Sequence, residues 1–471
     1  MSFILFILGR GQNKMIFKNF KRFFGNKAFY KMVFVVTIPI IIQQVLINVV
    51  NLADNVMVGQ LSQSDINGVY ISSQVLFVCN LCMFGSVAGS GIFFAQYFGS
   101  NDEKHLKFVF KFKIVAALII ASILFIVLTF FIEPIAHLFT DVETEIQVCK
   151  NYIGILKYSV FPFALSNVLA TSFREVKKTS IPMFGSALAL GINVILNYIL
   201  IFGHFGLPRL EIEGAAIATL IARFIELFFL IVMTYVLKMN YIKGLFKKGE
   251  KLENGLIPKL IKCSIPLFMN EFLWSFGQMV ISIGLCSRGE DARSGLAIAN
   301  TVNNLFYIGA LSLGNAISII IGNTLGAGEI EKAKIQARQL IMLAVFVAIG
   351  FGTALIGFSS LITKAYNVSD DVRQIAINTM IIFGSMMWMF AINCSCFFVI
   401  RAGGNTKIVL AFDSLFTWFI QVPLSLIFAF FTNVSFETIF FIVQGSEIIK
   451  LTLGLIMVHR NTWARNLVGV N

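Results

Sequence analysis

Residues 39–59 read PIIIQQVLINVVNLADNVMVG, an apolar helical stretch with a single carboxylate, Asp54, near its far end. A charged side chain at the centre of a membrane helix costs roughly 2.5–3.5 kcal/mol on insertion scales, so those that persist usually face a water-filled cavity or a partner. Asp54 is therefore the first candidate functional residue. The alternative is that Asp54 lies at the membrane boundary and only ends the helix.

The rest of the chain has the composition of a membrane protein. Of its 471 residues 57% are hydrophobic and 13% are charged, and the mean hydropathy is +0.84, whereas soluble domains contain about 25% charged residues. A membrane-spanning helix needs about 20 apolar residues, and we find twelve such stretches between residues 32 and 458. The sequence thus predicts an all-α integral membrane protein with twelve transmembrane helices.

The net charge of +13 indicates topology rather than nucleic-acid binding. Lys and Arg gather in alternate loops, which the positive-inside rule places in the cytoplasm. We expect a multi-pass protein of the cell membrane with a cytoplasmic N-terminal segment (1–31), linker (238–257) and C-terminal tail (459–471). The chain has no GxxxxGK[ST] motif that would bind a nucleotide.

The two halves of the chain are copies of one unit. An offset of 227 residues maps Pro39 onto Pro266, Gly68 onto Gly295, Gly99 onto Gly326, Arg174 onto Arg401 and Thr179 onto Thr406. Six spans per unit is an even number, so both units enter the membrane from the same side. We therefore expect an N-lobe (32–237) and a C-lobe (258–458) of six helices each, with the site between them, as is common in transporters built from repeats.

The acids break this symmetry. The offset pairs Asp54 with Ile281 and Glu271 with Gln44, so each lobe has an acid where the other lobe is uncharged. This asymmetry suggests a functional role, although the two copies could also have drifted apart.

Pro39 and Pro266 lie inside the first helix of each lobe. A proline removes one helical hydrogen bond and permits a bend. Each residue is a candidate hinge, and the alternative is a static kink.

Two amides and a hydroxyl could complete a site around Asp54. Asn193 and Asn197 are four residues apart and share a helix face, and Thr219 lies in the next span. Together they could form an oxygen-rich pocket for a sodium ion or a proton-linked water. Spacing alone favours hydrogen bonding between helices.

In the C-lobe, Glu271 is flanked by Asn270, Trp274 and Gln278. An acid, an aromatic ring and an amide within two turns could bind an organic cation by charge and ring stacking. The alternative is a hydrogen-bonded strut between the lobes.

Other intramembrane charges look structural. Arg223 and Glu226 are three residues apart, as are Glu447 and Lys450, and we expect an ion pair in each lobe. For Asp413 the nearby basic loop favours an interfacial position.

Cysteine and histidine do not suggest a metal site. Cys79 and Cys82 share one helix and Cys394 and Cys396 another, and all four histidines lie near span ends. We expect the cysteines to pack as small apolar side chains, and the scattered histidines argue against a membrane enzyme.

With these motifs the chain resembles the multidrug and toxic compound extrusion (MATE) transporters over essentially residues 32–458. The motifs are DNVMVG (54–59), AQYFG (95–99), SFREVKKTSIPM (172–183), NVILNYILIFG (193–203), GAAIATLIA (214–222) and GNTLGAG (322–328). The resemblance implies an antiporter that exports organic cations and amphipathic drugs as sodium ions or protons enter, by alternating access between two lobes. It implies no bound cofactor, and we expect a monomer in contact with membrane lipid.

The resemblance also implies roles for single residues. Asp54 matches the carboxylate implicated in cation coupling, and Asn193, Asn197 and Thr219 match other parts of that site, with sodium a candidate ion at Asp54. The chain departs from the family where Asn197 replaces a second aspartate and where Asn393 is the nearest polar residue to a missing span-ten acid. A lipid-linked oligosaccharide flippase of the same superfamily is the alternative function, and its cavity should carry several arginines.

Overall fold

The computed structural model describes residues 24–58, 60–239, 241–242, 255–364, 366 and 368–469, and every regular element within them is helical. The N-lobe contains α3 (Lys27–Val58), α4 (Gln63–Gly99), α5 (Glu103–Phe130), α6 (Ile132–Ala136), α7 (Glu143–Leu156), α8 (Val160–Glu175), α9 (Ser180–Phe202) and α10 (Glu211–Val236). The C-lobe contains α11 (Leu256–Cys286), α12 (Glu290–Gly326), α13 (Ile330–Thr363), α14 (Asp370–Ala402), α15 (Thr406–Leu410), α16 (Val422–Phe431), α17 (Phe436–Gly445) and α18 (Glu447–His459).

In the part of the chain that the structure describes, twelve helical segments run between the two ends of the molecule. Within the described residues, eleven are long and apolar enough to span a membrane, counting α7–α8, α15–α16 and α17–α18 as one segment each. The twelfth is α11, which has 31 residues and carries the polar side chains Asn270, Glu271 and Gln278. The predicted twelve-helix, two-lobe architecture is confirmed.

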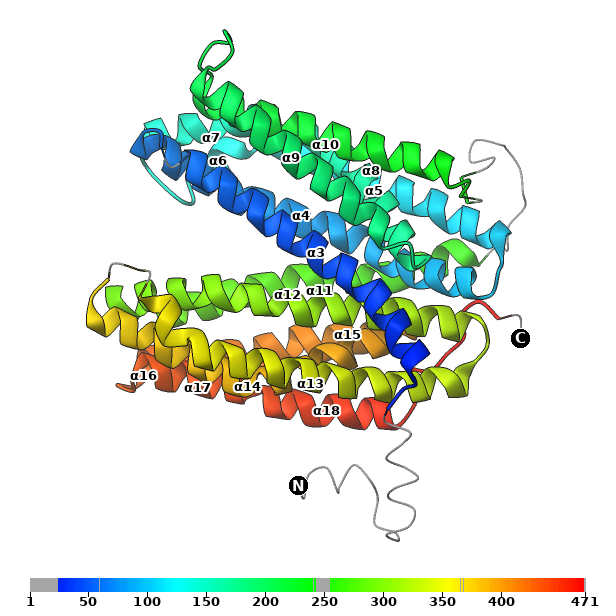
Figure 1. Cartoon of the computed structure of the whole chain (residues 1–471). Helices are drawn as coiled ribbons and strands as arrows, with labels where there is room; N and C mark the ends of the chain where they lie inside the picture. The colour runs from blue at the N-terminus through cyan, green and yellow to red at the C-terminus, as the bar shows by residue number, and fades with distance from the viewer. Residues whose placement is uncertain are drawn as a thin grey trace.

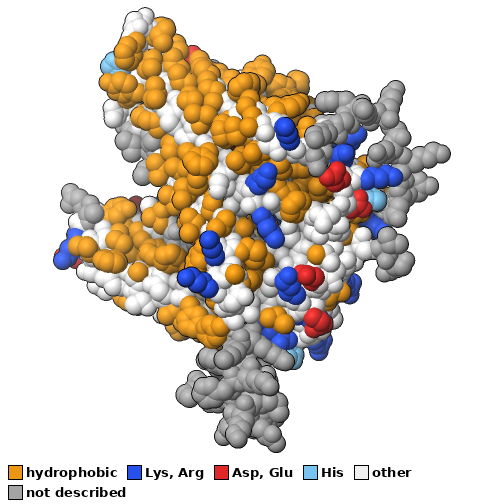
Figure 2. Space-filling model, turned by 45° about the vertical axis from the view of Figure 1, so that its right-hand side comes forward, with side chains coloured by type: hydrophobic (Ala, Val, Ile, Leu, Met, Phe, Trp, Pro, Cys, Tyr) orange, Lys and Arg blue, Asp and Glu red, His pale blue; other side chains and the backbone are white. Residues whose placement is uncertain are grey.

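The outer faces of the helices are apolar, as lipid contact requires. On α5, Val115, Ile119 and Ile123 are exposed, whereas Ala117 and Ala121 on the inner face are buried. Small inner residues let neighbouring helices approach closely. Hydrophobic side chains likewise cover much of the surface in Figure 2, where the lobes are separated by a notch.

The lobes meet at one end and diverge toward the other (Figure 1). We call the meeting end the basic end, because the turns after α4, α8, α12 and α14 lie there and basic residues gather in these turns or in the helix ends beside them. Here α3 and α4 pack against α11 and α12. Gly85 and Gly89 of α4 lie directly against Phe268 and Ser264 of α11.

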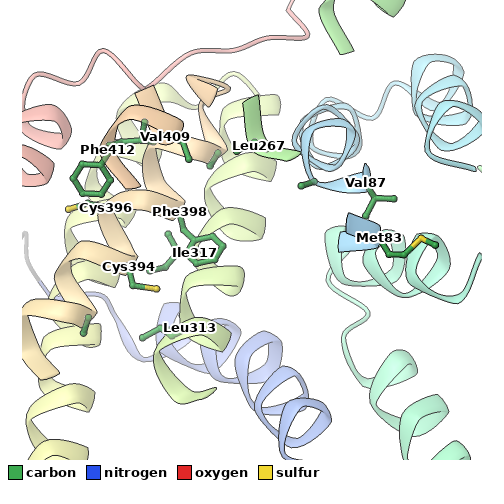
Figure 3. Packing of buried hydrophobic residues seen from close by; sticks show 14 of the residues in the cluster. Met83, Val87, Leu267, Leu313, Ile317, Cys394, Cys396, Phe398, Val409 and Phe412 are labelled. Carbon is green, nitrogen blue, oxygen red and sulfur yellow. The ribbon is translucent and has the colours of Figure 1, made fainter. Parts of the chain in front are cut away.

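The buried core extends across this junction. Figure 3 shows Met83 and Val87 of α4 on one side and Ile317 and Phe398 on the other, with Leu267 between them. All seven cysteines are free of disulfide bonds. Cys79, Cys394 and Cys396 are buried, and Cys82 is half-buried. The cysteines therefore pack as predicted.

The 227-residue repeat is visible in the packing. Gly68 of α4 lies against Val148, and Gly295 of α12 lies against Ile375, which is the same pair shifted by 227. A Cβ atom at either glycine would lie within 2.5 Å of a side-chain atom on the facing helix. Both lobes therefore use the same close helix contact.

Parts of the predicted domain division lie outside the described residues. These are residues 1–23 of the N-terminal segment 1–31, residues 240 and 243–254 of the linker 238–257, and the end of the tail 459–471. The boundaries of these segments stay predictions.

Candidate functional site

A continuous chain of hydrogen bonds links Asp54 to the three residues predicted around it. Asn197 Nδ2 donates to Asp54 Oδ1 and, at 3.2 Å, to Asn193 Oδ1. Asn193 Nδ2 in turn donates to Thr219 Oγ1 at 3.2 Å. The chain runs from α3 through α9 to α10, because α9 packs against both of the other helices.

The site lies inside the N-lobe, in the half away from the basic end. Asn193 and Asn197 are 2% and 0% exposed, and Asp54 is partly buried. Asp54 lies near the C-terminal end of α3 and is joined by a hydrogen bond to α9. Its role in binding a cation stays a prediction.

One acceptor in this site has no partner. Asn197 Oδ1 is buried, and no hydrogen bond reaches it within the described part of the chain. An orphaned buried oxygen costs about 1–3 kcal/mol, and a cation or a donating water would relieve that cost. The donor set of one carboxylate, two amides and a hydroxyl suits a hard cation or a proton.

The described residues also bear on transition-metal binding. Among the described residues, no group of three or more His, Cys, Asp or Glu side chains could hold a metal ion.

An apolar cluster surrounds the site, and sequence reasoning missed its polar member. Val58, Tyr152 and Ile201 belong to this cluster, and all three are buried. Tyr152 of α7 is close enough to Asp54 to interact with it electrostatically. A tyrosine in an apolar run gives no sequence signal that would have identified it.

A second polar chain crosses the N-lobe nearer the basic end. Gln43 Nε2 donates to Ser186 Oγ at 3.0 Å, and Ser186 Oγ donates to Glu226 Oε1 at 2.9 Å. Glu226 forms the predicted ion pair with Arg223 at 3.1 Å. Arg223 also lies 4.6 Å from the Phe163 ring centroid and interacts electrostatically with Asp54.

The predicted Glu447–Lys450 pair is wrong. Lys450 Nζ contacts Asp413 Oδ1 at 2.6 Å, and Glu447 instead accepts from Asn393 Nδ2 at 2.6 Å and from Gln421 Nε2 at 2.9 Å. Asp413 comes from the segment between α15 and α16, whose backbone forms two π-helical turns, Ala411–Leu415 and Thr417–Gln421. The π-helical turns change which side chains face the lobe interior.

The interfacial position expected for Asp413 is also wrong. Its side chain is 14% exposed, and Asp413 Oδ2 accepts from Asn270 Nδ2 at 3.1 Å. Ser414 Oγ donates to Asn270 Oδ1 at 2.8 Å. Asn270, predicted for the substrate cavity, is thus buried inside the C-lobe.

The other three predicted cavity residues share one face of α11. Glu271 follows Phe268 by three residues, so it continues the face that contacts α4 into the region where the lobes diverge. Trp274 and Gln278 are half-buried farther along this face. The Glu271 carboxylate is 4.0 Å from Arg401, and its side chain is 26% exposed.

Both candidate hinge prolines lie within unbroken helices. Pro39 is inside α3 and Pro266 is inside α11. Near Pro39, the side chains of Val36 and Ile40 are buried with Ala316 and Ile319 of α12. Whether either proline acts as a hinge stays a prediction.

Comparison with known proteins gives consistent matches. The MatE family model matches residues 39–199 and 266–450. A probable multidrug resistance protein NorM of Thermotoga maritima is 23% identical over 440 residues, 92% of each chain. A second NorM, of Oceanobacillus iheyensis, is 25% identical over 403 residues, 85% of this chain and 90% of that protein.

Solved structures share the fold. A MOP superfamily transporter from Pyrococcus furiosus, described as having a binding pocket of reverse polarity, has a TM-score of 0.83 at 16% identity and covers 93% of this chain and 97% of its own. An outward-facing multidrug resistance MATE family transporter has a TM-score of 0.82 at 17% identity, with 94% and 98% covered.

Proposed function

Since this chain belongs to the MatE family of membrane transporters, we propose that it is a cation-coupled antiporter that exports organic cations and amphipathic drugs. It is a multi-pass membrane protein and not an enzyme. The coupling proposal rests on the hydrogen-bonded chain at Asp54, in which the buried Asn197 Oδ1 has no partner among the described residues.

Asp54 is proposed to hold the coupling ion. One carboxylate among neutral amide and hydroxyl groups is neutralised by one sodium ion or one proton. Either ion competes with the Asn197 amide for the carboxylate, so its arrival changes the contact between α3 and α9. Because α3 also contacts the C-lobe through Val36 and Ile40, that change can bias the arrangement of the lobes.

The substrate is proposed to bind between the lobes beside Glu271. Its carboxylate is only loosely paired with Arg401 at 4.0 Å, so it retains charge for an organic cation. Trp274 on the same face supplies a ring surface. Coupling requires that ion and substrate differ in affinity between the two lobe arrangements.

Arg223 does not support the flippase alternative, because its charge is paired with Glu226 at 3.1 Å. A cavity for an anionic lipid-linked sugar would need unpaired positive charge.

The test is efflux of a fluorescent organic cation from vesicles containing the purified protein, driven separately by a sodium gradient and by a pH gradient. The parent should respond to at least one gradient. Asp54→Asn should abolish that response while the melting temperature in detergent stays within about 2 °C of the parent, because Asn keeps the shape of the side chain.

The matched control is Asp65→Asn. Asp65 is an acid of the same lobe that caps α4 and is not connected to the site. Full gradient-driven efflux by Asp54→Asn would refute the assignment of the coupling residue.

A further inference from the structure

The ends of α4 and α12 cross at two glycines where the lobes meet. A Cβ atom at Gly99 would lie 2.0 Å from the carbonyl oxygen of Asn323, and one at Gly326 would lie 1.9 Å from that of Gln96. Gly99 and Gly326 are related by the 227-residue repeat, and so are Gln96 and Asn323. Only glycine permits the two backbones to approach this closely, so the crossing is built symmetrically into both lobes.

The two amides at this crossing reach into opposite lobes. Gln96 Nε2 of the N-lobe donates to the carbonyl oxygen of Ala402 at 3.0 Å, and Asn323 Nδ2 of the C-lobe donates to that of Glu175 at 3.0 Å. The acceptors also differ by 227 residues. Both are carbonyls in the last turn of a helix, where no helical donor is available.

We call these four residues, Gln96, Asn323, Ala402 and Glu175, the amide latch. Gln96 is 0% exposed and Asn323 is 4% exposed. Breaking either bond without replacement would leave buried polar groups unsatisfied, which is costly. Both bonds must therefore form or break together with contact between the lobes.

The C-terminal segment Trp463–Val468 adds to one side of the latch. Leu467 N donates to Gln96 Oε1 at 2.8 Å, and Gln96 Nε2 also reaches the carbonyl oxygen of Arg465 at 3.4 Å. Trp463 is 1% exposed and its carbonyl oxygen lies against Gly403. The segment is thus fixed to the C-lobe and contributes donors and acceptors to Gln96.

Within the described part of the chain, no salt bridge crosses the contact, because each ion pair joins groups of one lobe. The charges of Glu175 and Arg401 interact across the contact from a longer distance. A cavity of about 480 Å³, lined by Gly99, Lys177 and Asn323, adjoins the latch, so water can replace the broken bonds when the lobes separate. Neutral hydrogen bonds that can exchange with water suit a contact that opens repeatedly.

We propose that the amide latch, together with Trp463–Val468, is the gate that holds the basic end closed. The inference rests on the proposed transport cycle, because a gate matters only if this end opens. Each net hydrogen bond changes an equilibrium by roughly fivefold. Loss of one latch bond should therefore raise the ratio of open to closed lobes by about that factor.

Spin labels across the basic end measure this ratio. Lys104→Cys at the start of α5 and Glu331→Cys at the start of α13 place one label on each lobe, and both residues are exposed. The background carries Cys82→Ala and Cys286→Ala, since the other five cysteines are buried. Distances between labels are measured by double electron–electron resonance on the reconstituted full-length protein.

Gln96→Met and Asn323→Leu remove the amides and keep side chains of similar size. Asn323→Leu removes one bond between the lobes and should raise the ratio of long to short distances roughly fivefold. Gln96→Met also removes the bond from Leu467 N, so its effect should be at least as large, and the double variant should show at least about a 25-fold rise if the bonds act independently. The matched control is Gln374→Met, since the Gln374 side chain is exposed and, among the described residues, bonds to Asn378 of its own helix α14. The control should match the parent.

Truncation tests the C-terminal segment separately. A chain that stops after Arg465 lacks the Leu467 donor but keeps Trp463, and it should shift in the same direction as Gln96→Met. A chain that stops after Gly469 should not shift. The two truncated chains also test the latch if Gln96→Met does not give a folded protein.

Distance distributions that are identical in the latch variants and in Gln374→Met would overturn the proposal, as would the absence of long distances in every variant. Failure of the antiport proposal would be seen separately, as absent gradient-driven efflux by the unlabelled parent.

Discussion

At the scale of single residues, the charge of the candidate cation site depends on position 197. The only formal negative charge among the four residues of the site is on Asp54, and the neutral amide of Asn197 donates a hydrogen bond to Asp54. One sodium ion or one proton therefore suffices to neutralise the site. Changing the charge at residue 197 should change what the site binds.

Asn197→Asp should strengthen cation binding. Two carboxylates in contact cannot both be ionised without a cation or a shared proton, so the apparent sodium affinity at pH 8 should rise at least about tenfold. The measurement is the sodium dependence of the melting temperature in detergent. Asn151→Asp, at an exposed amide of α7 bonded to Gln147, is the control, and an unchanged sodium dependence in Asn197→Asp would contradict the site.

Lys450→Met should destabilise the C-lobe, because it leaves Asp413 with no positive partner in a largely buried position. Loss of one partner of a buried pair costs roughly 3–5 kcal/mol. Asp413→Asn in the Lys450→Met background should recover most of that loss, as judged by thermal unfolding. Arg373→Met, in the exposed pair with Asp370, should change stability by less than about 1 kcal/mol, and a double variant as unstable as Lys450→Met would argue against the pair.

At the scale of helices, the sequence predicted which helices exist and their order better than it predicted how each helix is rotated about its axis. Hydropathy and the 227-residue offset were sufficient for twelve spans in two lobes. The i, i+4 spacing placed Asn193 and Asn197 on one face, and the structure joins both to Asp54. Hydropathy is the same for α- and π-helical turns, so it could not show that Asp413 faces Lys450.

The sequence also did not reveal the uncharged hydrogen-bond partners of Glu226. Gln43 and Ser186 connect α3 to Glu226 through hydrogen bonds. One amide and one serine in apolar helices are common, and their contact depends on how α3 and α9 are rotated. Sequence spacing within one helix carries no information about that rotation.

The turns after α8 and α14 give a test of the repeat. Lys177 has φ +61° where its repeat partner Gly404 has φ +79°. A left-handed backbone conformation costs a non-glycine residue roughly 1–2 kcal/mol. The Lys177 side chain is also partly desolvated: burial, and then the nearby charge of Lys332, lowers its pKa. Lys177→Gly should leave the free energy of unfolding unchanged or raise it by up to about 1 kcal/mol, since greater freedom of the unfolded chain offsets part of the gain.

The reciprocal change, Gly404→Lys, should be destabilising by more than 1 kcal/mol. In addition to the backbone cost, a Cβ atom there would lie 2.5 Å from Leu467 Cδ1. Thermal unfolding of the two variants should therefore give unequal effects. A larger loss of stability in Lys177→Gly would show that the two turns are not equivalent.

At the scale of the whole molecule, α3 connects the candidate cation site to the contact between lobes. Asp54 lies near one end of α3, while Val36 and Ile40 pack on α12 nearer the basic end. Pro39 lies within this contact, between Val36 and Ile40 along the chain. A change at Asp54 can therefore reach the lobe contact through a single helix, and the glycine crossing is the place where its effect on lobe separation can be tested independently.

Gly326→Ala should open the basic end without altering the candidate cation site. The added Cβ would meet the backbone of Gln96 at 1.9 Å, and a backbone cannot rotate away as a side chain can, so α4 and α12 must separate. We expect a larger population of long distances between labels at Lys104 and Glu331, with the sodium dependence of melting unchanged because Asp54 and Asn197 are untouched. Gly350→Ala on α13, where a Cβ meets no atom within 4 Å, should match the parent in both measurements. If Gly326→Ala and Gly350→Ala gave the same distances between labels, the close crossing would not control lobe separation. If Gly326→Ala also lost the sodium dependence of its melting temperature, the gate and the cation site would not be separable in the way the structure predicts.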